Sequence, residues 1–166
     1  MTEIRYYHLT RRSLEEALPQ LLLKTLDRGW KAVVMTGTAD RVEALNTHLW
    51  TWNDRDFLPH GSAADGEAPH QPVWLTHLDE NPNGATVLFL TEDAETARAG
   101  DYELVCRLFD GRDTEALARA RACWTADRDA GHRLTYWQQT GQGWVLKAEA
   151  GGADAGSATD AGEGKS

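Results

Sequence analysis

The sequence predicts an α/β fold, a three-layer α/β/α sandwich around a mostly parallel, Rossmann-like sheet of about five strands. Three observations lead to this prediction. Strand-like and helix-like segments alternate along the chain. The strand-like segments are short, continuous apolar runs, which is typical of parallel strands covered on both faces. The helix-like segments carry apolar residues at helical spacing and begin at recognisable capping residues.

The first expected elements are a strand at 4–9 and a helix after it. Ser13 and Glu16 fit a capping box, in which each side chain binds the backbone of the other residue. Five leucines follow at helical spacing: Leu14, Leu18, Leu21, Leu22 and Leu26. Gly29 is a natural end for this helix. Because Pro19 lies inside the span, either the first turn is irregular or the helix begins near Pro19.

The rest of the chain continues the alternation. After the short apolar strand expected at 32–35, a second helix is expected with Asp40 and Glu43 as candidate capping residues. The remaining strands are expected at 32–35, 73–76, 85–90 and 102–109, and the last long helix at 113–130. The folded domain is therefore predicted to span 1–148. The segment 149–166 consists of small and charged residues without an aromatic ring, so we expect it to be a disordered tail.

Composition and charge exclude some classes of function and favour others. The formal net charge of −9 argues against binding of phosphate backbones over the whole surface, although a local basic patch is compatible with it. Seven tryptophans are a high count, and such rings often serve recognition. Cys106 and Cys123 lack metal-ligand spacing and are expected to be reduced thiols. Without a signal-peptide pattern or an apolar run long enough for a bilayer, we expect a cytoplasmic protein that does not contact membranes.

No motif for catalysis stands out. The chain lacks G-x-G-x-x-G, G-x-x-x-x-G-K-[ST] and G-x-S-x-G. His60, His70 and His77, with Asp65 and Glu67 nearby, match no compact metal-ligand spacing. We therefore expect no catalytic residues, no metal and no cofactor. A nucleotide-handling α/β enzyme with its site at the carboxyl ends of the strands stays the alternative, and direct binding of single-stranded DNA through aromatic rings is a third hypothesis.

The last helix, ALARARACWTADRDAG, places arginines beside a tryptophan in an acidic chain. At about 100° per residue, Leu117, Arg121, Trp124 and Arg128 share one stripe. Alanines occupy the opposite side, and small residues let a helix lie close to a sheet, so we expect the alanine side to face inward. The alternative is an ordinary amphipathic helix with Trp124 in the core. An outward stripe favours binding of an acidic or carboxylate-ended peptide, because guanidinium groups pair with carboxylates and stack on rings.

Five segments, in order, resemble the chi subunit of bacterial DNA polymerase III: IRYYHL; GWKAVVMTGTADRVEALNTHLW; LW followed by FLPHG; QPVWLT followed by NPNGATVLFL; and the arginine-rich helix ending in RDAG. The LW and FLPHG pair is the most specific of them. The resemblance covers most of residues 1–148. It implies a small α/β/α adaptor subunit without catalytic activity of its own.

The resemblance also implies partners. They are the clamp-loader complex, through the psi subunit where one exists, and the acidic C-terminal tail of single-stranded DNA-binding protein, with DNA contacted indirectly. That tail ends in aspartates, Ile or Leu, Pro and a terminal Phe carboxylate. The implied peptide-binding residues are Trp50, Phe57, Leu108, Arg121, Trp124 and Arg128. Leu117 and Thr125 stand where members of the family carry lysines, which makes the expected pocket less basic.

Overall fold

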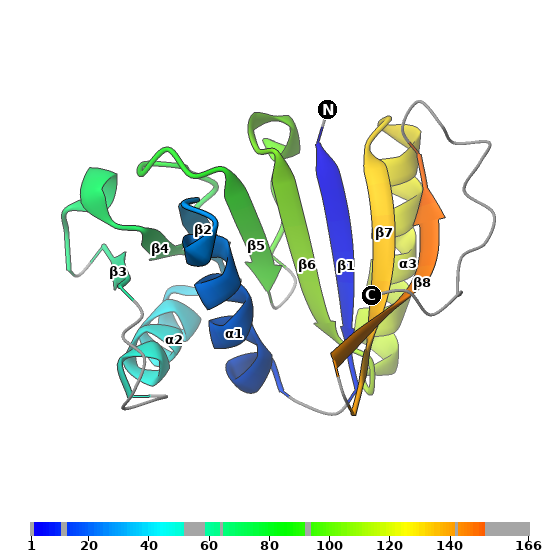
Figure 1. Cartoon of the computed structure of the whole chain (residues 1–166), viewed down its shortest axis with the longest axis horizontal. Coiled ribbons are helices and arrows are strands. Elements are labelled where there is room, and N and C mark those ends of the chain that lie inside the picture. The colour runs from blue at the N-terminus through cyan, green and yellow to red at the C-terminus, as the bar shows by residue number, and fades with distance from the viewer. Residues whose placement is uncertain are drawn as a thin grey trace.

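The computed structural model describes residues 2–10, 13–51, 59–63, 65–91, 94–141 and 143–151 (Figure 1). In chain order the elements are β1 (Glu3–Leu9), α1 (Leu14–Asp27), β2 (Ala32–Met35), α2 (Ala39–Thr51), β3 (Gly61–Ser62), η1 (Ala68–His70), β4 (Val73–Thr76), β5 (Val87–Thr91), η2 (Ala99–Asp101), β6 (Leu104–Asp110), α3 (Thr114–Asp129), β7 (Arg133–Thr140) and β8 (Gly143–Ala150). The predicted α/β class is confirmed.

The described strands form one eight-stranded sheet in the order β3-β4-β2-β5-β6-β1-β7-β8. Neighbouring strands pair in parallel, except that β7 and β8 form an antiparallel hairpin. The expected count of about five strands is too low. It omits β3, which is only two residues long, and both strands of the hairpin, whose mixed polar and apolar residues do not form the continuous apolar runs of covered parallel strands.

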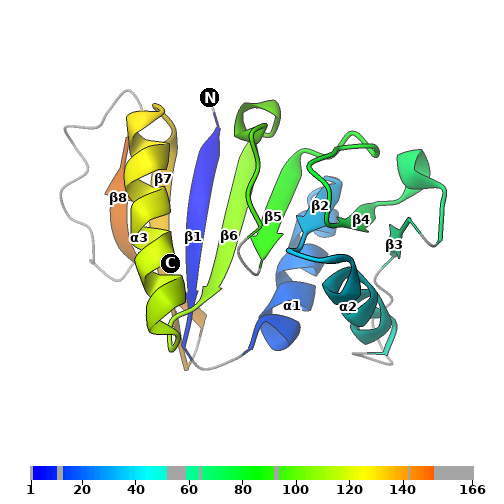
Figure 2. The same cartoon turned by 180° about the vertical axis from the view of Figure 1, so that it is seen from behind.

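Successive residues of the central strands point to opposite faces, and each face has its own core cluster. Val34 faces a cluster to which the leucines of α1 and α2 contribute. Val33 faces the other cluster, to which Trp124 and Cys123 of α3 contribute. Figure 1 shows α3 behind the sheet, and Figure 2 shows the same helix in front of it. The helix α3 therefore lies on a different face from α1 and α2.

Helix α1 begins at Leu14, and Pro19 lies inside it. Both halves of the predicted capping box form: the Glu16 amide donates to Ser13 Oγ over 3.3 Å, and the Ser13 amide donates to Glu16 Oε1 over 3.0 Å. Pro19 has no N–H to donate to the carbonyl of Glu15, one turn earlier. That carbonyl instead accepts from His48 Nε2 of α2 over 2.6 Å. A contact between two helices thus replaces the missing bond within one.

The hairpin closes one edge of the sheet. Trp144 of β8 packs edge-on against Tyr7 of β1, with ring centroids 4.8 Å apart. Strand β8 continues to Ala150, so its last two residues fall in the segment expected to be a tail. Residues 152–166 of that segment lie outside the described residues. Among the helices of the described ranges, none is long and apolar enough to cross a bilayer.

Candidate functional site

Helix α3 lies over β6 and β7 with a rotation that differs from the expected one. The side chains turned toward the sheet, buried or half-buried, are Ala116, Ala120, Cys123, Trp124 and Asp127. Ala118, Ala122, Ala126 and Ala130 are exposed. The expectation of an inward alanine side is therefore wrong, and the alternative with Trp124 against the core is right. The physical reason is that an indole ring removes far more apolar surface from water than a row of methyl groups does.

Trp124 belongs to an aromatic cluster beneath α3, which consists of Tyr6, His8, Phe109, Trp124 and Tyr136. Trp124 packs on Tyr6 with ring centroids 5.2 Å apart and on Tyr136 with centroids 6.0 Å apart. His8 Nδ1 and the hydroxyl of Tyr136 lie 2.7 Å apart in a hydrogen bond. Phe109 stacks at an angle on both of these rings. The cluster gives α3 an aromatic floor on β1, β6 and β7.

A buried polar network ties the same helix to the sheet. The hydroxyl of Tyr6 donates to Asp127 Oδ2 over 2.6 Å, and Arg107 Nε donates to the same oxygen over 3.1 Å. Arg107 also forms an ion pair with Glu95 at 3.2 Å. Burial, followed by the hydrogen bond to Asp127, raises the pKa of Tyr6. Because its charge is paired within the protein, Arg107 acts as a structural residue.

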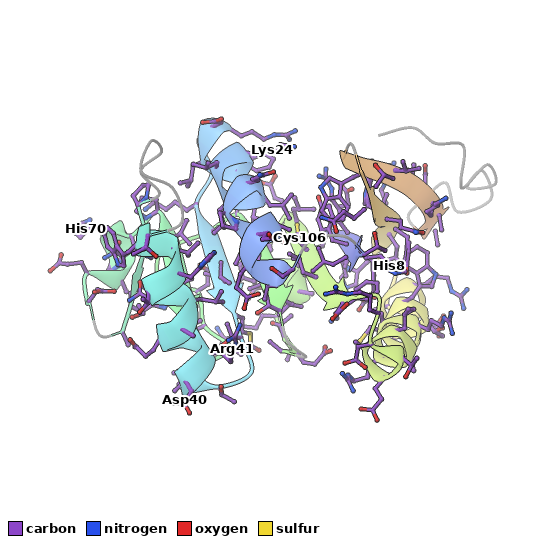
Figure 3. All side chains as sticks on the ribbon, turned by 90° about the horizontal axis from the view of Figure 1, so that it is seen from below. His8, Lys24, Asp40, Arg41, His70 and Cys106 are labelled. Carbon is purple, nitrogen blue, oxygen red and sulfur yellow. The ribbon has the colours of Figure 1, made fainter. Side chains whose placement is uncertain are left out.

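Arg121 and Arg128 are exposed on α3. Burial lowers the pKa of His8, and the positive charge of Arg121 lowers it further, so this guanidinium lies close to the aromatic cluster. Figure 3 shows His8 beside α3. Arg128 has a half-exposed side chain that lies 3.6 Å from the carboxylate of Asp129 on the same helix. Such exposed pairs are weak, so Arg128 can exchange this neighbour for a ligand carboxylate.

A pocket of about 500 Å³ lies at the carboxyl ends of β1, β5 and β6, between the first turns of α1 and α3. Leu108, only 5% exposed, contributes to its floor. Its other lining residues include Leu9, Leu14, Phe109, Ala116, Ala120, Arg107, Arg112, Arg119, Glu15, Glu95, Asp110 and Asp113. Because β1 leads into a helix on one face and β6 into a helix on the other, the pocket occupies the switch point at which open α/β sheets bind ligands.

The chemistry of this pocket does not favour a nucleotide phosphate. The first turn of α3 is already capped, since Asp113 Oδ1 accepts from the amides of Glu115 and Ala116. Ser13 caps α1 in the same way. The helix-end amides that hold phosphates in nucleotide-binding folds are therefore engaged. The lining also carries four acidic side chains against three arginines, while its apolar part suits a single ring.

Trp50 lies in another part of the molecule. It lies in the last turn of α2, which packs on β3 and β4. The residue is 51% exposed, and its ring centroid lies 4.5 Å from that of His60. In Figure 3 the cyan α2 and the yellow-green α3 lie on opposite sides of α1. Phe57 lies outside the described residues. The structure thus brings Arg121, Trp124 and Arg128 together on α3, places Leu108 in the adjacent pocket, and keeps Trp50 apart from them.

Sequence reasoning missed the partners of Trp124. Tyr6 and His8 are two residues apart in a strand and therefore face the same side, a signal present in IRYYHL. Tyr136 had no such signal, because β7 was not expected as a strand. The three loop histidines do not converge: within the described ranges no three His, Cys, Asp or Glu side chains are placed to hold a metal ion.

Fold and site together define a small α/β protein that presents arginines beside an aromatic cluster on one surface helix. The family model described as DNA polymerase III chi subunit, HolC, matches residues 1–135. The chain therefore belongs to the DNA polymerase III chi subunit family, which confirms the resemblance seen in the sequence. DNA polymerase III is the replicative enzyme to which this family contributes a subunit.

A curated relative agrees with this assignment. The chain is 32% identical over 98 residues to "Probable DNA polymerase III subunit chi" of Rickettsia prowazekii (strain Madrid E). The match covers 59% of this chain and 59% of the relative, so the chain spans about three fifths of that protein's length. The family match ends within β7, and strand β8 lies beyond it.

Proposed function

We propose that this chain is a non-catalytic adaptor of the replicative DNA polymerase III and binds the acidic C-terminal tail of single-stranded DNA-binding protein along α3. The observation that carries the proposal is the pair of exposed arginines, Arg121 and Arg128, beside the ring of Trp124 on one helix. Arg128 lies seven positions after Arg121, which is about 10 Å along the helix. Family membership supports the proposal, since it links the chain to the polymerase complex.

The chemistry of the proposed ligand matches this surface in two parts. Its aspartates pair with Arg121 and Arg128, because a guanidinium binds carboxylates through charge-assisted hydrogen bonds. Its terminal Phe enters the neighbouring pocket, where Leu108 and Ala120 provide apolar contacts and Arg119 lies close to the terminal carboxylate. Five extended residues span about 16 Å, which suffices to reach from the arginines to the pocket.

The wider proposal concerns assembly. The adaptor joins the clamp-loader complex in the cytoplasm, through a psi subunit where one exists, and contacts DNA only through its partner. Trp50, whose ring is 51% exposed, is proposed as a contact for partner residues that precede the last five of the tail. Replacing Trp50 by Ala is then expected to weaken binding of a long tail peptide and to leave binding of the five-residue peptide unchanged.

The test is a fluorescence titration with a labelled D-D-[IL]-P-F peptide that carries a free carboxylate. We expect a Kd in the micromolar class that rises with salt through screening. Arg128→Glu is expected to raise the Kd tenfold or more, because a charge-assisted pair becomes a repulsive one. The matched control is Lys24→Glu on α1, on the other face of the sheet (Figure 3), and it is expected to bind as the wild type does.

Two outcomes would contradict the proposal. One is an Arg128→Glu variant that binds the peptide with the wild-type Kd. The other is stabilisation of the chain by ATP or NAD in a thermal shift assay, with none by the peptide, which would favour the nucleotide-handling alternative.

A further inference from the structure

The last residues of β8 lie close to the C-terminal end of α3. Ala150 pairs with Leu134, at the start of the strand that follows α3. Gly151 has a φ of 80°, and a Cβ atom on it would lie 2.0 Å from the carbonyl oxygen of His132. Because only glycine tolerates both the conformation and the contact, the position at which the chain leaves the sheet is fixed. It lies beside His132 in the turn after α3, four residues beyond Arg128 in the chain.

The residues that follow Gly151 are acidic. Segment 152–166 carries Asp154, Asp160 and Glu163 against the single Lys165, and it contains no aromatic residue. At the end of α3 beside which the segment begins, Arg128 and Arg133 are both exposed, and Arg128 lies 3.6 Å from Asp129 of the same helix. The carboxylates of the segment are therefore complementary to these two guanidinium groups and compete with Asp129 for Arg128.

We propose that segment 152–166 is an intramolecular ligand of the arginine surface of α3 and competes there with the acidic tail of the partner. This inference rests on the proposed function, because it assigns a competitor to the same arginines. Its direct consequence is that the affinity for the partner is set by the charge of the chain's own C-terminal segment.

The lengths allow this contact. Asp154 lies three residues beyond Gly151 and can reach about 10 Å, enough for Arg128. Asp160 lies nine residues beyond and can reach about 30 Å, while Arg121 is about 10 Å farther along the helix than Arg128. Because the segment is tethered, its effective concentration at the helix is in the millimolar range.

The composition of the segment limits its strength. It has carboxylates for the arginines but no ring for the apolar pocket beside Leu108. Contacts between exposed charges alone are weak, so the segment lowers the apparent affinity of the surface without closing it. A partner tail that ends in Phe displaces it, since the ring adds a contact that the segment cannot make.

The experiment uses the full chain with three neutral substitutions, Asp154→Asn, Asp160→Asn and Glu163→Gln. Without any peptide, NMR follows the Nε–Hε signals of Arg121 and Arg128. We expect both signals to shift in the variant, in the direction that added salt shifts them in the wild type, while the signal of Arg28 at the end of α1 stays in place. Unchanged signals of Arg121 and Arg128 would overturn the inference.

A peptide titration on the same variant tests the competition. The Kd for the D-D-[IL]-P-F peptide is expected to fall about threefold relative to the wild type, as a tethered weak competitor is removed. The matched control removes the same charge from the far half of the sheet, with Asp40→Asn, Glu43→Gln and Glu67→Gln, and is expected to leave the Kd unchanged. Equal Kd values for wild type and tail variant would overturn the competition. Failure of the peptide to bind either chain would overturn the proposed function, and the NMR comparison separates that result from a failure of the tail contact.

Discussion

At the scale of single residues, Arg121 links the solvent-exposed side of α3 to the ring of His8 beneath it. Burial lowers the pKa of His8 first, and the Arg121 charge adds to this effect. The imidazole is hydrogen-bonded to Tyr136 over 2.7 Å. A carboxylate that neutralises Arg121 would remove part of the cause of the low pKa. The pKa of His8 therefore indicates whether a carboxylate is bound to Arg121, although His8 itself does not contact that carboxylate.

Replacing Arg121 by Gln is expected to raise the pKa of His8, measured by NMR titration of its ring protons. Peptide binding to the wild type is expected to raise it as well, because a carboxylate offsets the guanidinium charge. Proton uptake by His8 and peptide binding are then linked with positive sign, so the Kd falls as the pH falls through the pKa of His8. A Lys24→Gln control is expected to leave the pKa of His8 unchanged. An unchanged pKa of His8 in Arg121→Gln would show that the Arg121 charge does not act on this ring.

Asp127 is the residue on which the stability of the α3 contact depends most. Its carboxylate accepts from both Tyr6 and Arg107, and the Arg107 side chain is only 13% exposed. Asp127→Ala leaves that cation buried with its ion pair to the more exposed Glu95, so we expect a loss of about 3 kcal/mol in the free energy of unfolding. Urea denaturation measures the loss. Asp127→Asn keeps an acceptor for both donors and is expected to lose less; equal losses would argue against the charge as the cause.

At the scale of elements, α1 and α2 are joined through the irregularity that Pro19 introduces. The helix tolerates proline because His48 donates to the carbonyl that a residue with an N–H would otherwise bind. Arg41 adds an ion pair to the side chain of Glu15 at 2.7 Å. The first turn of α1, which borders the pocket, is therefore positioned by α2 as well as by the sheet.

This arrangement predicts a coupling between His48 and Pro19. His48→Ala is expected to destabilise the protein by about 1 kcal/mol, since the Glu15 carbonyl loses its donor. Pro19→Ala supplies an amide in its place, so the substitution is expected to stabilise the His48→Ala background more than it stabilises the wild type. A double-mutant cycle from urea denaturation measures the difference. Additive effects would show that the two residues do not share this acceptor.

The elements that the sequence predicts well are those with one dominant signal. The strand near 4–9 is rich in residues that favour strands, the strand at 32–35 is a continuous apolar run, and α1 has its capping box and leucine spacing. Strands β7 and β8 lack such a signal because the hairpin lies at one edge of the sheet and its residues are mostly half-exposed. The rotation of α3 was misjudged because close packing of alanines was weighed above burial of Trp124. The order of the strands depends on contacts between distant segments, which a single sequence does not contain.

At the scale of the whole molecule, the charge distribution disfavours nucleic acid as a direct partner and favours an acidic peptide. The net charge of −9 repels nucleic acid, while Arg121 and Arg128 attract carboxylates locally. We therefore expect no gel shift of naked single-stranded DNA at moderate salt. DNA covered by single-stranded DNA-binding protein is expected to be retarded further when this chain is added, and less so with Arg128→Glu. A shift of naked DNA would instead support direct binding through aromatic rings.

The central position of β1 has a consequence for synthesis. Its two neighbours are β6, where Leu104 pairs with Glu3, and β7, where Arg133 pairs with the same residue. Strand β1 leaves the ribosome before both of them, so its backbone can pair only after partners made about a hundred residues later have been synthesised. A nascent chain of this architecture would need to keep β1 from misassociating until β6 and β7 are made, and slow elongation would lengthen that exposure.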